Sequence, residues 1–165
     1  MKQLGDIYEQ IQPKLYTFFY IKTANASVAE DLTQDVFYEA MKSIHRFNGQ
    51  SSISTWLFAI AHHLLAKYYR SNRYKRTLHE NFKQFGSPSH PLTTEQQVEL
   101  QESAQTLLKN INALDTPGKE IVLLRIYGDC SFKEIGEMLG KSENYVRVTF
   151  HRLKLKLQQE MEGAE

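Results

Sequence analysis

The stretch that decides the fold is Ser131 to Leu157, SFKEIGEMLGKSENYVRVTFHRLKLKL. Ser131 is followed three residues later by Glu134, a capping box in which a hydroxyl and a carboxylate satisfy backbone amides at a helix start. Gly140 is expected to end this helix, because glycine adopts the left-handed conformation after a helix end at little cost. Ser142 can then cap a second helix. The stretch therefore predicts two helices joined by a tight turn.

Both predicted helices have an apolar face. The first repeats apolar residues at helical spacing, at Phe132, Ile135, Met138 and Leu139. The second repeats a buried stripe, at Val146, Phe150, Leu153 and Leu157. Its other face is polar and largely basic, with Asn144, Arg147, Val148, His151, Arg152 and Lys154. A short helix, a glycine turn and a basic second helix are typical of a DNA-binding helix-turn-helix, and an ordinary helical hairpin with a solvated basic face is the alternative.

Composition sets outer limits on the class of protein. The 165 residues suffice for one ordinary domain or two small ones, and 41% hydrophobic with 24% charged residues is normal for a soluble globular protein. No apolar run approaches the roughly 20 residues that cross a bilayer, and MKQLGDIYEQ contains no hydrophobic signal core. The single cysteine, Cys130, cannot form an internal disulfide. We therefore expect a protein of the reducing cytoplasm.

The formal net charge of +1 conceals separate charged regions. Four acidic residues crowd one short stretch: Glu30, Asp31, Asp35 and Glu39. No further acid occurs until Glu80, and basic residues lie in between: Lys42, Arg46, Lys67, Arg70, Arg73, Lys75 and Arg76. A second basic cluster lies in the C-terminal stretch, where Glu143 is the only acidic residue among its members: Lys141, Arg147, Arg152, Lys154 and Lys156. This separation suggests a polyanion contacted twice and a basic protein partner contacted once.

Helical periodicity predicts three helices in the first half, over residues 4–22, 27–43 and 56–70. Pro13 lies inside the first and could kink or split it. Their apolar faces are expected to form a core from Ile7, Tyr8, Ile11, Leu15, Phe18, Phe19, Val28, Leu32, Val36, Phe37, Ala40, Leu57, Ile60, Ala61, Leu64 and Leu65, with Met41 nearby.

The second of these helices is predicted to have an acidic face. Ser27 and Glu30 form a capping box that opens it. Asp31, Asp35 and Glu39 follow at a spacing of four, where like charges repel by a few tenths of a kcal/mol each. The repulsion suggests a cationic partner, and a merely solvated face fits about equally well.

The third helix follows a polar loop with an Asn48-Gly49 turn signal, and Ser54 or Thr55 can cap it. Aromatic and basic side chains then alternate toward its end, at Tyr68, Tyr69, Arg70, Arg73, Tyr74, Lys75 and Arg76. Rings can stack on unpaired bases, at roughly 1–3 kcal/mol per base, while cations follow the backbone. Trp56 suits either this role or a place in a small helical core.

A linker is predicted over residues 78–97, which contain two prolines and no core periodicity. Helical spacing returns over 98–114. Thr116 and Pro117 are then expected to cap and start another helix, with apolar Ile121, Val122, Leu124 and Ile126. We therefore expect an all-α chain with two small helical domains, residues 1–77 and 98–165, joined by a flexible linker; the second contains the helix-turn-helix.

With these pieces placed, the chain resembles the extracytoplasmic-function (ECF) sigma factors, the compact branch of bacterial sigma factors. AEDLTQDVFYEAM (residues 29–41) and RFNGQSSISTWLFAIAHHLL (residues 46–65) resemble the second conserved sigma region. The stretch from Leu114 through RIYGDCSFKEIGEMLGKSENYVRVTFHRLKLKL resembles the fourth region. The order and spacing of both make the resemblance far more specific than a lone helix-turn-helix.

The resemblance implies a promoter-specificity subunit of bacterial core RNA polymerase, with no catalysis, cofactor or metal of its own. Core polymerase would dock on Asp31, Gln34, Asp35 and Glu39. The melted minus-ten element, including a flipped base, would be bound by Asn48, Gly49, Gln50, Ser51, Ser52, Trp56, His63, Lys67, Arg70 and Arg73. The duplex minus-thirty-five element would be read by Ser142, Asn144, Tyr145, Arg147, Val148, His151, Arg152 and Lys154.

The resemblance also implies binding partners, and this chain differs from many relatives at several positions. The linker would thread along the polymerase's RNA path, and an anti-sigma factor, often a membrane protein in this family, would cover the polymerase-binding surfaces. Many relatives carry arginine and asparagine where this chain has Ala59, His62 and His63, and a small residue and arginine near Val148 and Thr149. The resemblance therefore implies neither the promoter sequence nor the inducing stress.

Two other classes of function fit the sequence less well. A conventional operator-binding regulator would dimerise and use only the last domain, which leaves the acidic helix and the aromatic-basic stretch unexplained. An enzyme would need a metal held by His62, His63 and Cys130 or by the acidic helix, but adjacent histidines on a helix point about 100° apart. No phosphate loop or nucleophile motif occurs. Cys130 is expected to be a small packing residue rather than a redox sensor.

Overall fold

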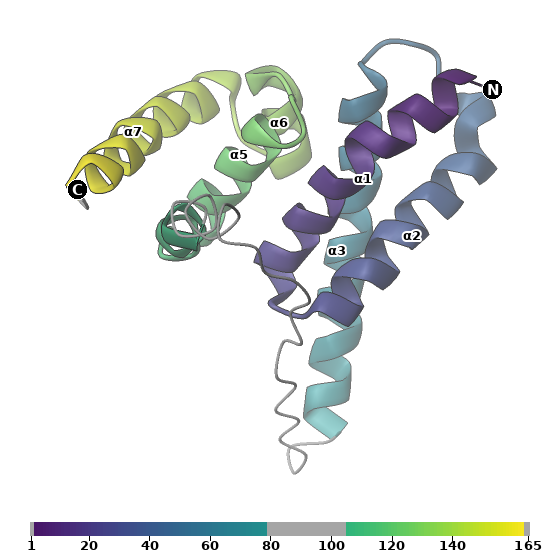
Figure 1. The fold of residues 1–165 in the computed structure, drawn as a ribbon, viewed down its shortest axis with the longest axis horizontal. Coiled ribbons are helices and arrows are strands. Elements are labelled where there is room, and N and C mark those ends of the chain that lie inside the picture. The colour runs from purple at the N-terminus through teal and green to yellow at the C-terminus, as the bar shows by residue number, and fades with distance from the viewer. Residues whose placement is uncertain (1, 79–104, 164–165) are drawn as a thin grey trace, which may run out of the picture. The chain divides into compact units, whose positions relative to one another are not determined.

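The computed structural model describes residues 2–78 and 105–163, and every regular element in these ranges is a helix (Figure 1). The chain divides into two compact units, Met1–Pro88 and Ser89–Glu165. The expected all-α class with two helical regions is confirmed. The domain limits stay a prediction, because residues 79–97 of the proposed linker lie outside the described ranges.

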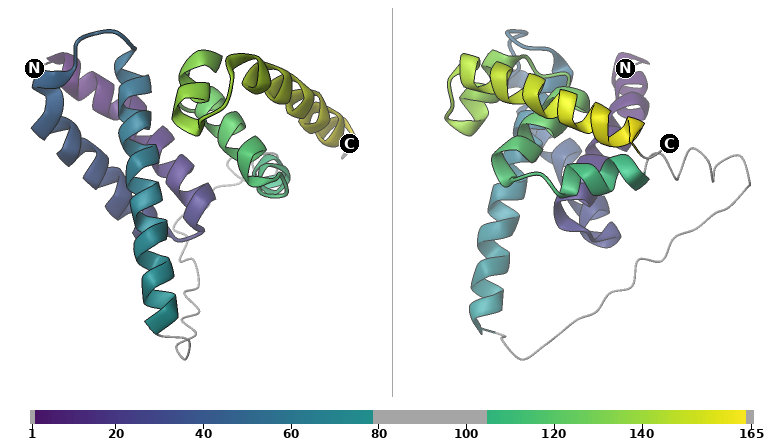
Figure 2. Two further views of the ribbon diagram at one scale, coloured as in Figure 1. Left: turned by 180° about the vertical axis from the view of Figure 1, so that it is seen from behind. Right: turned by 90° about the vertical axis from the view of Figure 1, so that its left-hand side faces the viewer.

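Three α-helices build the described part of the first unit: α1 (Lys2–Thr23), α2 (Ala26–Ser43) and α3 (Ile53–Leu78), with a short 3-10 helix, η1 (Ile44–Arg46), directly after α2. α2 packs along both of the others, and the left view of Figure 2 shows teal α3 running in front of α1 and α2. Phe18 of α1 lies edge-on against Phe58 of α3, with ring centres 5.6 Å apart. The buried core is Ile11, Leu15, Phe18, Phe19, Ile21, Ala29, Leu32, Val36, Ala40, Leu57, Phe58, Ala61 and Leu65.

The start of α2 differs from the prediction. Its N-cap is Asn25, whose side-chain oxygen accepts a hydrogen bond from the Val28 amide at 3.1 Å, so the capping box predicted at Ser27 is wrong. Pro13 does not split α1, which is continuous through it. Thr17 donates its hydroxyl to the Pro13 carbonyl at 2.9 Å within this helix.

The third helix starts earlier and ends later than the sequence indicates. Ser52 provides the cap, because its hydroxyl accepts a hydrogen bond from the Thr55 amide at 3.1 Å; the predicted cap at Ser54 or Thr55 is wrong. α3 then continues to Leu78 instead of ending near residue 70. Tyr8, predicted to be core, is half exposed and packs against Phe37 at 4.6 Å between ring centres.

The second unit is built around α7 (Glu143–Glu162), which packs on α5 (Thr116–Ile126) and α6 (Phe132–Leu139), with residues 105–112 also helical. Its buried residues are Ile111, Ile121, Val122, Leu123, Leu124, Cys130, Ile135, Val146, Phe150, Leu153 and Leu157. Cys130 is wholly buried, and its thiol donates to a backbone carbonyl two residues earlier at 3.6 Å, as a packing residue would.

The helix-turn-helix is confirmed in its details. The Ser131 hydroxyl accepts from the Glu134 amide at 3.1 Å, and the Glu134 carboxylate accepts from the Ser131 amide at 2.8 Å. Gly140 adopts the left-handed conformation with φ of +67°. The Ser142 hydroxyl accepts from the Tyr145 amide at 3.1 Å and so caps α7. Each of these bonds is local, which is why the sequence predicts them.

The helix before it, α5, differs from the prediction at its start. Its cap is Asp115, whose carboxylate accepts from the Gly118 amide at 3.1 Å, and the predicted cap Thr116 is already the first helical residue. Of its four expected apolar residues, Ile121, Val122 and Leu124 are buried and Ile126 is half exposed, while Leu123 is buried in addition. The helix is therefore buried on more than one side.

Candidate nucleic-acid interface

The acidic face of α2 is formed by Asp31, Gln34 and Asp35, all exposed on the side of the helix away from the core. Glu39, predicted to belong to this set, lies at its edge. Its carboxylate is 3.2 Å from the Lys42 ammonium, and it lines a groove that α2 shares with α3. The structure thus groups three of the four predicted residues and turns the fourth toward α3.

Two exposed apolar residues on α2 were missed by sequence reasoning. Tyr38 and Met41 are 61% and 66% exposed, although Met41 was expected near the apolar face. The Lys42 ammonium lies 5.1 Å from the centre of the Tyr38 ring. Their offset from the buried stripe of Leu32 and Val36 was the available signal.

The loop before α3 is shaped by its own side chains. Gly49 has φ of +74°, which confirms the predicted turn. The Asn48 side-chain oxygen accepts from the Gln50 amide at 3.2 Å, and the Ser51 hydroxyl donates to the Ser52 carbonyl at 3.2 Å. Since Ser52 also caps α3, three of the five predicted loop residues bind the loop itself. Gln50 is exposed.

A groove of about 420 Å³ between α2 and α3 brings three predicted minus-ten residues together: Trp56, His63 and Lys67. Glu39 lies on the opposite, α2 side of the groove. The Trp56 ring is tilted against Phe47, with ring centres 5.1 Å apart. Trp56 is therefore partly packed and partly exposed to the groove, so both predicted roles are open to it.

The basic end of α3 begins about one helical turn after Lys67. Arg70 is exposed, and Arg73 lies in the helix beyond the side chains that the structure describes. Tyr69 donates its hydroxyl to the Lys22 carbonyl at 2.6 Å and thereby fastens α1 to α3. The Tyr68 ring lies against Tyr69 at 5.8 Å. Part of the aromatic pattern that predicted base stacking thus serves helix packing.

All eight residues predicted to read duplex DNA are exposed, at the cap or along α7: Ser142, Asn144, Tyr145, Arg147, Val148, His151, Arg152 and Lys154. Arg147 forms an ion pair with Glu143 at 2.9 Å, one turn earlier on the same helix. Val148 and Leu155 are 58% and 60% exposed, so the outermost strip of α7 is partly apolar. An apolar strip suits thymine methyl groups, and flanking cations suit phosphates.

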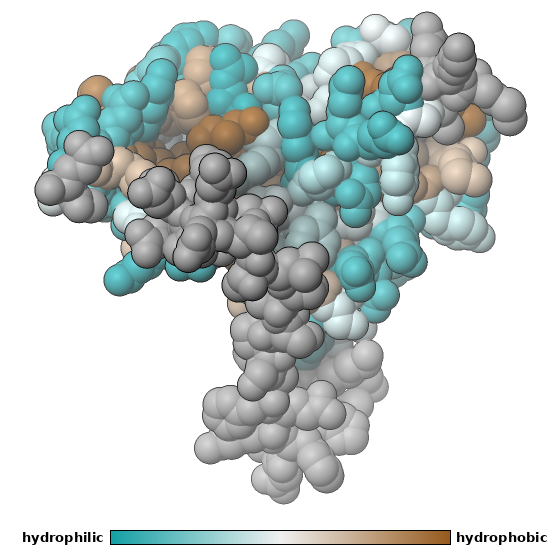
Figure 3. Space-filling model, viewed as in Figure 1, coloured by the Kyte–Doolittle hydropathy of each residue, from teal (hydrophilic) through white to brown (hydrophobic). Residues whose placement is uncertain are grey.

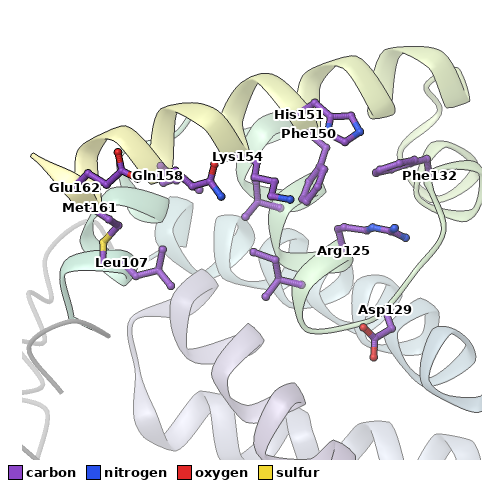
Figure 4. Close-up of a pocket in the computed structure, with 13 residues that line it drawn as sticks. Leu107, Arg125, Asp129, Phe132, Phe150, His151, Lys154, Gln158, Met161 and Glu162 are labelled. Carbon is purple, nitrogen blue, oxygen red and sulfur yellow. The ribbon is translucent and has the colours of Figure 1, made fainter. Parts of the chain in front are cut away.

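Phe132 lies near the cations of two helices, and Figure 4 shows it with Arg125 and His151. The Arg125 guanidinium of α5 lies 4.4 Å from the ring centre and the Arg147 guanidinium of α7 lies 6.0 Å from it. His151 meets the same ring edge-on at 5.8 Å, and Arg125 also donates to the Cys130 carbonyl at 2.9 Å. Sequence reasoning missed Arg125, because nothing in the helical pattern shows which ring it will meet.

A groove of about 750 Å³ runs beside these residues within the second unit, lined by Leu107, Phe150 and Met161 together with His151 and Lys154. In Figure 3 brown hydrophobic residues gather in a hollow at the upper left, with teal hydrophilic residues above them. Lys154, expected to face DNA, therefore also borders an apolar groove between α7 and α5.

Neither a metal centre nor a membrane span is found in the residues that the structure describes. No three His, Cys, Asp or Glu side chains lie close enough in residues 2–78 or 105–163 to hold a metal ion. In those same ranges, no helix is sufficiently long and apolar to cross a bilayer.

Comparison with known proteins adds an independent line of argument. The family model Sigma-70 region 2 matches residues 7–74, and Sigma-70, region 4 matches residues 104–157. RNA polymerase sigma factor YlaC of Bacillus subtilis is 32% identical over 160 residues, which cover 96% of this chain and 91% of that protein. ECF RNA polymerase sigma factor SigX of Bacillus subtilis is 27% identical over 152 residues, 88% of this chain and 77% of that one.

The fold agrees as well. The sigma factor RpoE of Bartonella quintana, solved in complex with the anti-sigma factor NepR, matches with a TM-score of 0.73 at 19% identity and covers 98% of both chains. The match to region 2 includes the acidic face, the loop and the α2–α3 groove, which an operator-binding regulator would leave unexplained. Sigma factors are transcription initiation factors. The chain belongs to the ECF class of RNA polymerase sigma factors.

Proposed function

We propose that this sigma factor binds core RNA polymerase through Asp31, Gln34 and Asp35 of α2. These side chains are exposed, and the two carboxylates repel each other at a spacing of four. A cationic partner surface would relieve that repulsion and steer association. Tyr38 adds an exposed ring that such a contact would bury. Glu39, at the edge of the face, was expected in this contact from the family resemblance.

The first unit also binds the melted minus-ten strand in this proposal. The α2–α3 groove offers the Trp56 ring for stacking, and Lys67 with Arg70 follows the backbone. The loop with Gln50 receives the flipped base. Extruding a base costs a few kcal/mol, which contacts with polymerase and with the exposed strand must offset. The protein alone is therefore expected to melt DNA poorly.

The second unit reads the minus-thirty-five element as duplex through α7. Asn144 and Val148, on the exposed side of α7, and His151, beside the Phe132 ring, would face the base edges. Arg147 and Arg152 flank them and would neutralise phosphates. The remaining residues of the predicted set, Ser142, Tyr145 and Lys154, border this strip.

The observation that carries the proposal is the division of charge between the two matched regions. The region 2 match contains the acidic face and the groove, and the region 4 match contains the basic helix. Polymerase would hold the two weak promoter contacts at a fixed spacing. Binding of one element then raises the effective concentration for the other, so the overall affinity exceeds that of either contact alone. Domains of residues 1–77 and 98–165, with the linker of 78–97 between them on the polymerase's RNA path, would provide that spacing.

We further propose an anti-sigma factor as partner. The matched RpoE was solved with one, NepR, and a membrane-anchored form of such a partner would couple this chain to an external signal. The partner would compete with polymerase for the exposed face of α2. Because core polymerase and the promoter lie in the bacterial cytoplasm, we assign this chain to the same compartment.

The test mixes purified protein with bacterial core polymerase and a pool of genomic promoter fragments, and then maps transcript starts. Defined starts that require the protein are the expected result, and their upstream sequences would identify both promoter elements. A protein that forms no complex with core but binds a palindromic duplex alone would overturn the proposal in favour of an operator-binding regulator.

A further inference from the structure

One carboxylate of the acidic helix lies at the side of α2 next to α3. Glu39 lines the α2–α3 groove together with Trp56, His63 and Lys67, whereas Asp31 and Asp35 are not among the residues of that groove. Successive residues of a helix are 100° apart, so Glu39 lies about 80° around α2 from Asp31 and 40° from Asp35. The sequence spacing suggested one shared acidic face, but the packing of α3 divides it.

The groove offers three chemically different walls. The Trp56 ring, held against Phe47, provides a flat stacking surface. Lys67 provides a cation, and Glu39 provides oxygen atoms that accept hydrogen bonds when ionised. A nucleotide of a single strand has the matching parts: a π-face, a phosphate and a base edge with hydrogen-bond donors.

A carboxylate such as that of Glu39 is unexpected beside DNA, because its negative charge repels the phosphate backbone. The ion pair with Lys42 offsets some of this repulsion, but the two side chains remain 42% and 56% exposed, so the pair is weak. The carboxylate is thus available to exchange Lys42 for a base edge. Its charge also keeps the phosphates on the Lys67 side of the groove.

We propose that the α2–α3 groove holds one unpaired base of the promoter strand, and that Glu39 selects there a base with an amino group. This inference rests on the proposed function. An ionised carboxylate only accepts hydrogen bonds. Adenine, cytosine and guanine offer it an amino group, whereas the one ring N–H of an unpaired thymine lies between two carbonyl oxygens that repel a carboxylate. Glu39 is then a specificity determinant of strand recognition and not a polymerase contact.

The experiment uses holoenzyme, assembled from core polymerase and the full chain, and a pool of single-stranded DNA with 20 random nucleotides. Bound strands are sequenced for the wild type, Glu39→Gln, Lys42→Ala and the control Glu30→Gln, which makes the same chemical change at an exposed residue of α2 outside the groove. Affinity for core polymerase is measured for each variant. The amide of Glu39→Gln can present a donor or an acceptor and should lose the discrimination.

The expected result is one position of the selected motif at which the wild type prefers amino-bearing bases over thymine by about tenfold. Glu39→Gln should reduce that preference to near twofold and leave the rest of the motif and core affinity unchanged, while Lys42→Ala and Glu30→Gln keep it. An unaltered motif for Glu39→Gln overturns the inference. So does a loss of core affinity in that variant, which would return Glu39 to the polymerase face. Wild-type holoenzyme that selects no motif would refute the proposed function itself.

Discussion

The guanidinium of Arg125 lies 4.4 Å from the centre of the Phe132 ring, and the same ring meets His151 at 5.8 Å. One aromatic residue in the first turn of α6 therefore joins the end of α5 to the proposed DNA-reading helix. A cation over a ring stabilises by roughly 0.5–1 kcal/mol where exposed and more where desolvated. The orientation of α7 should depend on this ring.

Replacing that ring tests the dependence. Phe132→Ala should lower the free energy of unfolding of the second unit by about 2 kcal/mol, less than the 3–5 kcal/mol of a fully buried phenylalanine. Phe132→Leu keeps apolar volume and should lose about half as much, with weakened duplex binding because Arg147 and His151 lose their support. Urea unfolding and duplex titration measure both effects. Wild-type stability in both variants would show that the ring is dispensable.

Charge reversal on α2 tests the polymerase face. Asp31→Lys combined with Asp35→Lys should weaken core binding at least about tenfold, because two attractive contacts become repulsive. Both residues are exposed, so the circular dichroism spectrum and melting temperature should stay unchanged. The control, Glu9→Lys with Glu30→Lys, makes the same change in net charge at exposed residues elsewhere on the first unit. A double variant that binds core normally would disprove the assignment.

Promoter choice should depend on α7. Arg147→Ala and His151→Ala are each expected to cost about 1–3 kcal/mol in promoter discrimination while affinity for core polymerase survives. Competitive transcription from cognate and mismatched promoters measures the discrimination, and core binding is measured in parallel. Equal losses on every DNA sequence would instead indicate that these residues contact only phosphates.

Glu143 should weaken DNA binding in the native protein, because its carboxylate holds the Arg147 guanidinium at 2.9 Å. Glu143→Gln removes the negative charge at the helix start, which costs about 0.3–1 kcal/mol of stability. It should tighten duplex binding several-fold and steepen the dependence on salt concentration. Glu137→Gln, at an exposed residue of α6, is the matched control. Unchanged affinity in Glu143→Gln would mean that Arg147 already leaves the pair on binding.

The parts of the fold that the sequence predicted are those determined by neighbouring residues. The capping box of Ser131 and the left-handed Gly140 involve only residues within a few positions of each other. The start of α2 was mispredicted because Asn25 and Ser27 are both good caps. In the structure Asn25 is the cap, and it directly follows Ala24, which has a left-handed φ of +53°.

Contacts between distant residues were beyond the sequence pattern. The spacing of four that placed Glu39 with Asp31 is correct for an isolated helix, but it does not show where α3 will lie. In the same way, periodicity grouped half-exposed Tyr8 with the core residues of its helix, because apolar character alone does not show which stripe a neighbouring helix covers. The meeting of Arg125 with Phe132 likewise depends on how α5 packs against α6.

A glycine inside α6 provides the last prediction. A methyl group at Gly136 would lie 2.6 Å from the carbonyl oxygen of Lys141 and 3.4 Å from the carbonyl carbon of Ser142. Both atoms are backbone of the turn, where the Lys141 amide also donates to the Gly136 carbonyl at 2.9 Å, so the methyl group would force the two helices apart. Gly136→Ala should therefore destabilise the second unit by about 2 kcal/mol.

The sign of this effect is opposite to that expected from helix propensity, which favours alanine over glycine by about 1 kcal/mol. Gly5→Ala in α1 is the matched control, because nothing lies within 4 Å of the added methyl group. It should leave stability unchanged or raise it by up to about 1 kcal/mol, since a position near the helix end gains less. Thermal unfolding of both variants measures the contrast. If Gly136→Ala were as stable as Gly5→Ala, the turn between α6 and α7 would have to relax freely, and its close packing could not be what fixes the angle of the DNA-reading helix.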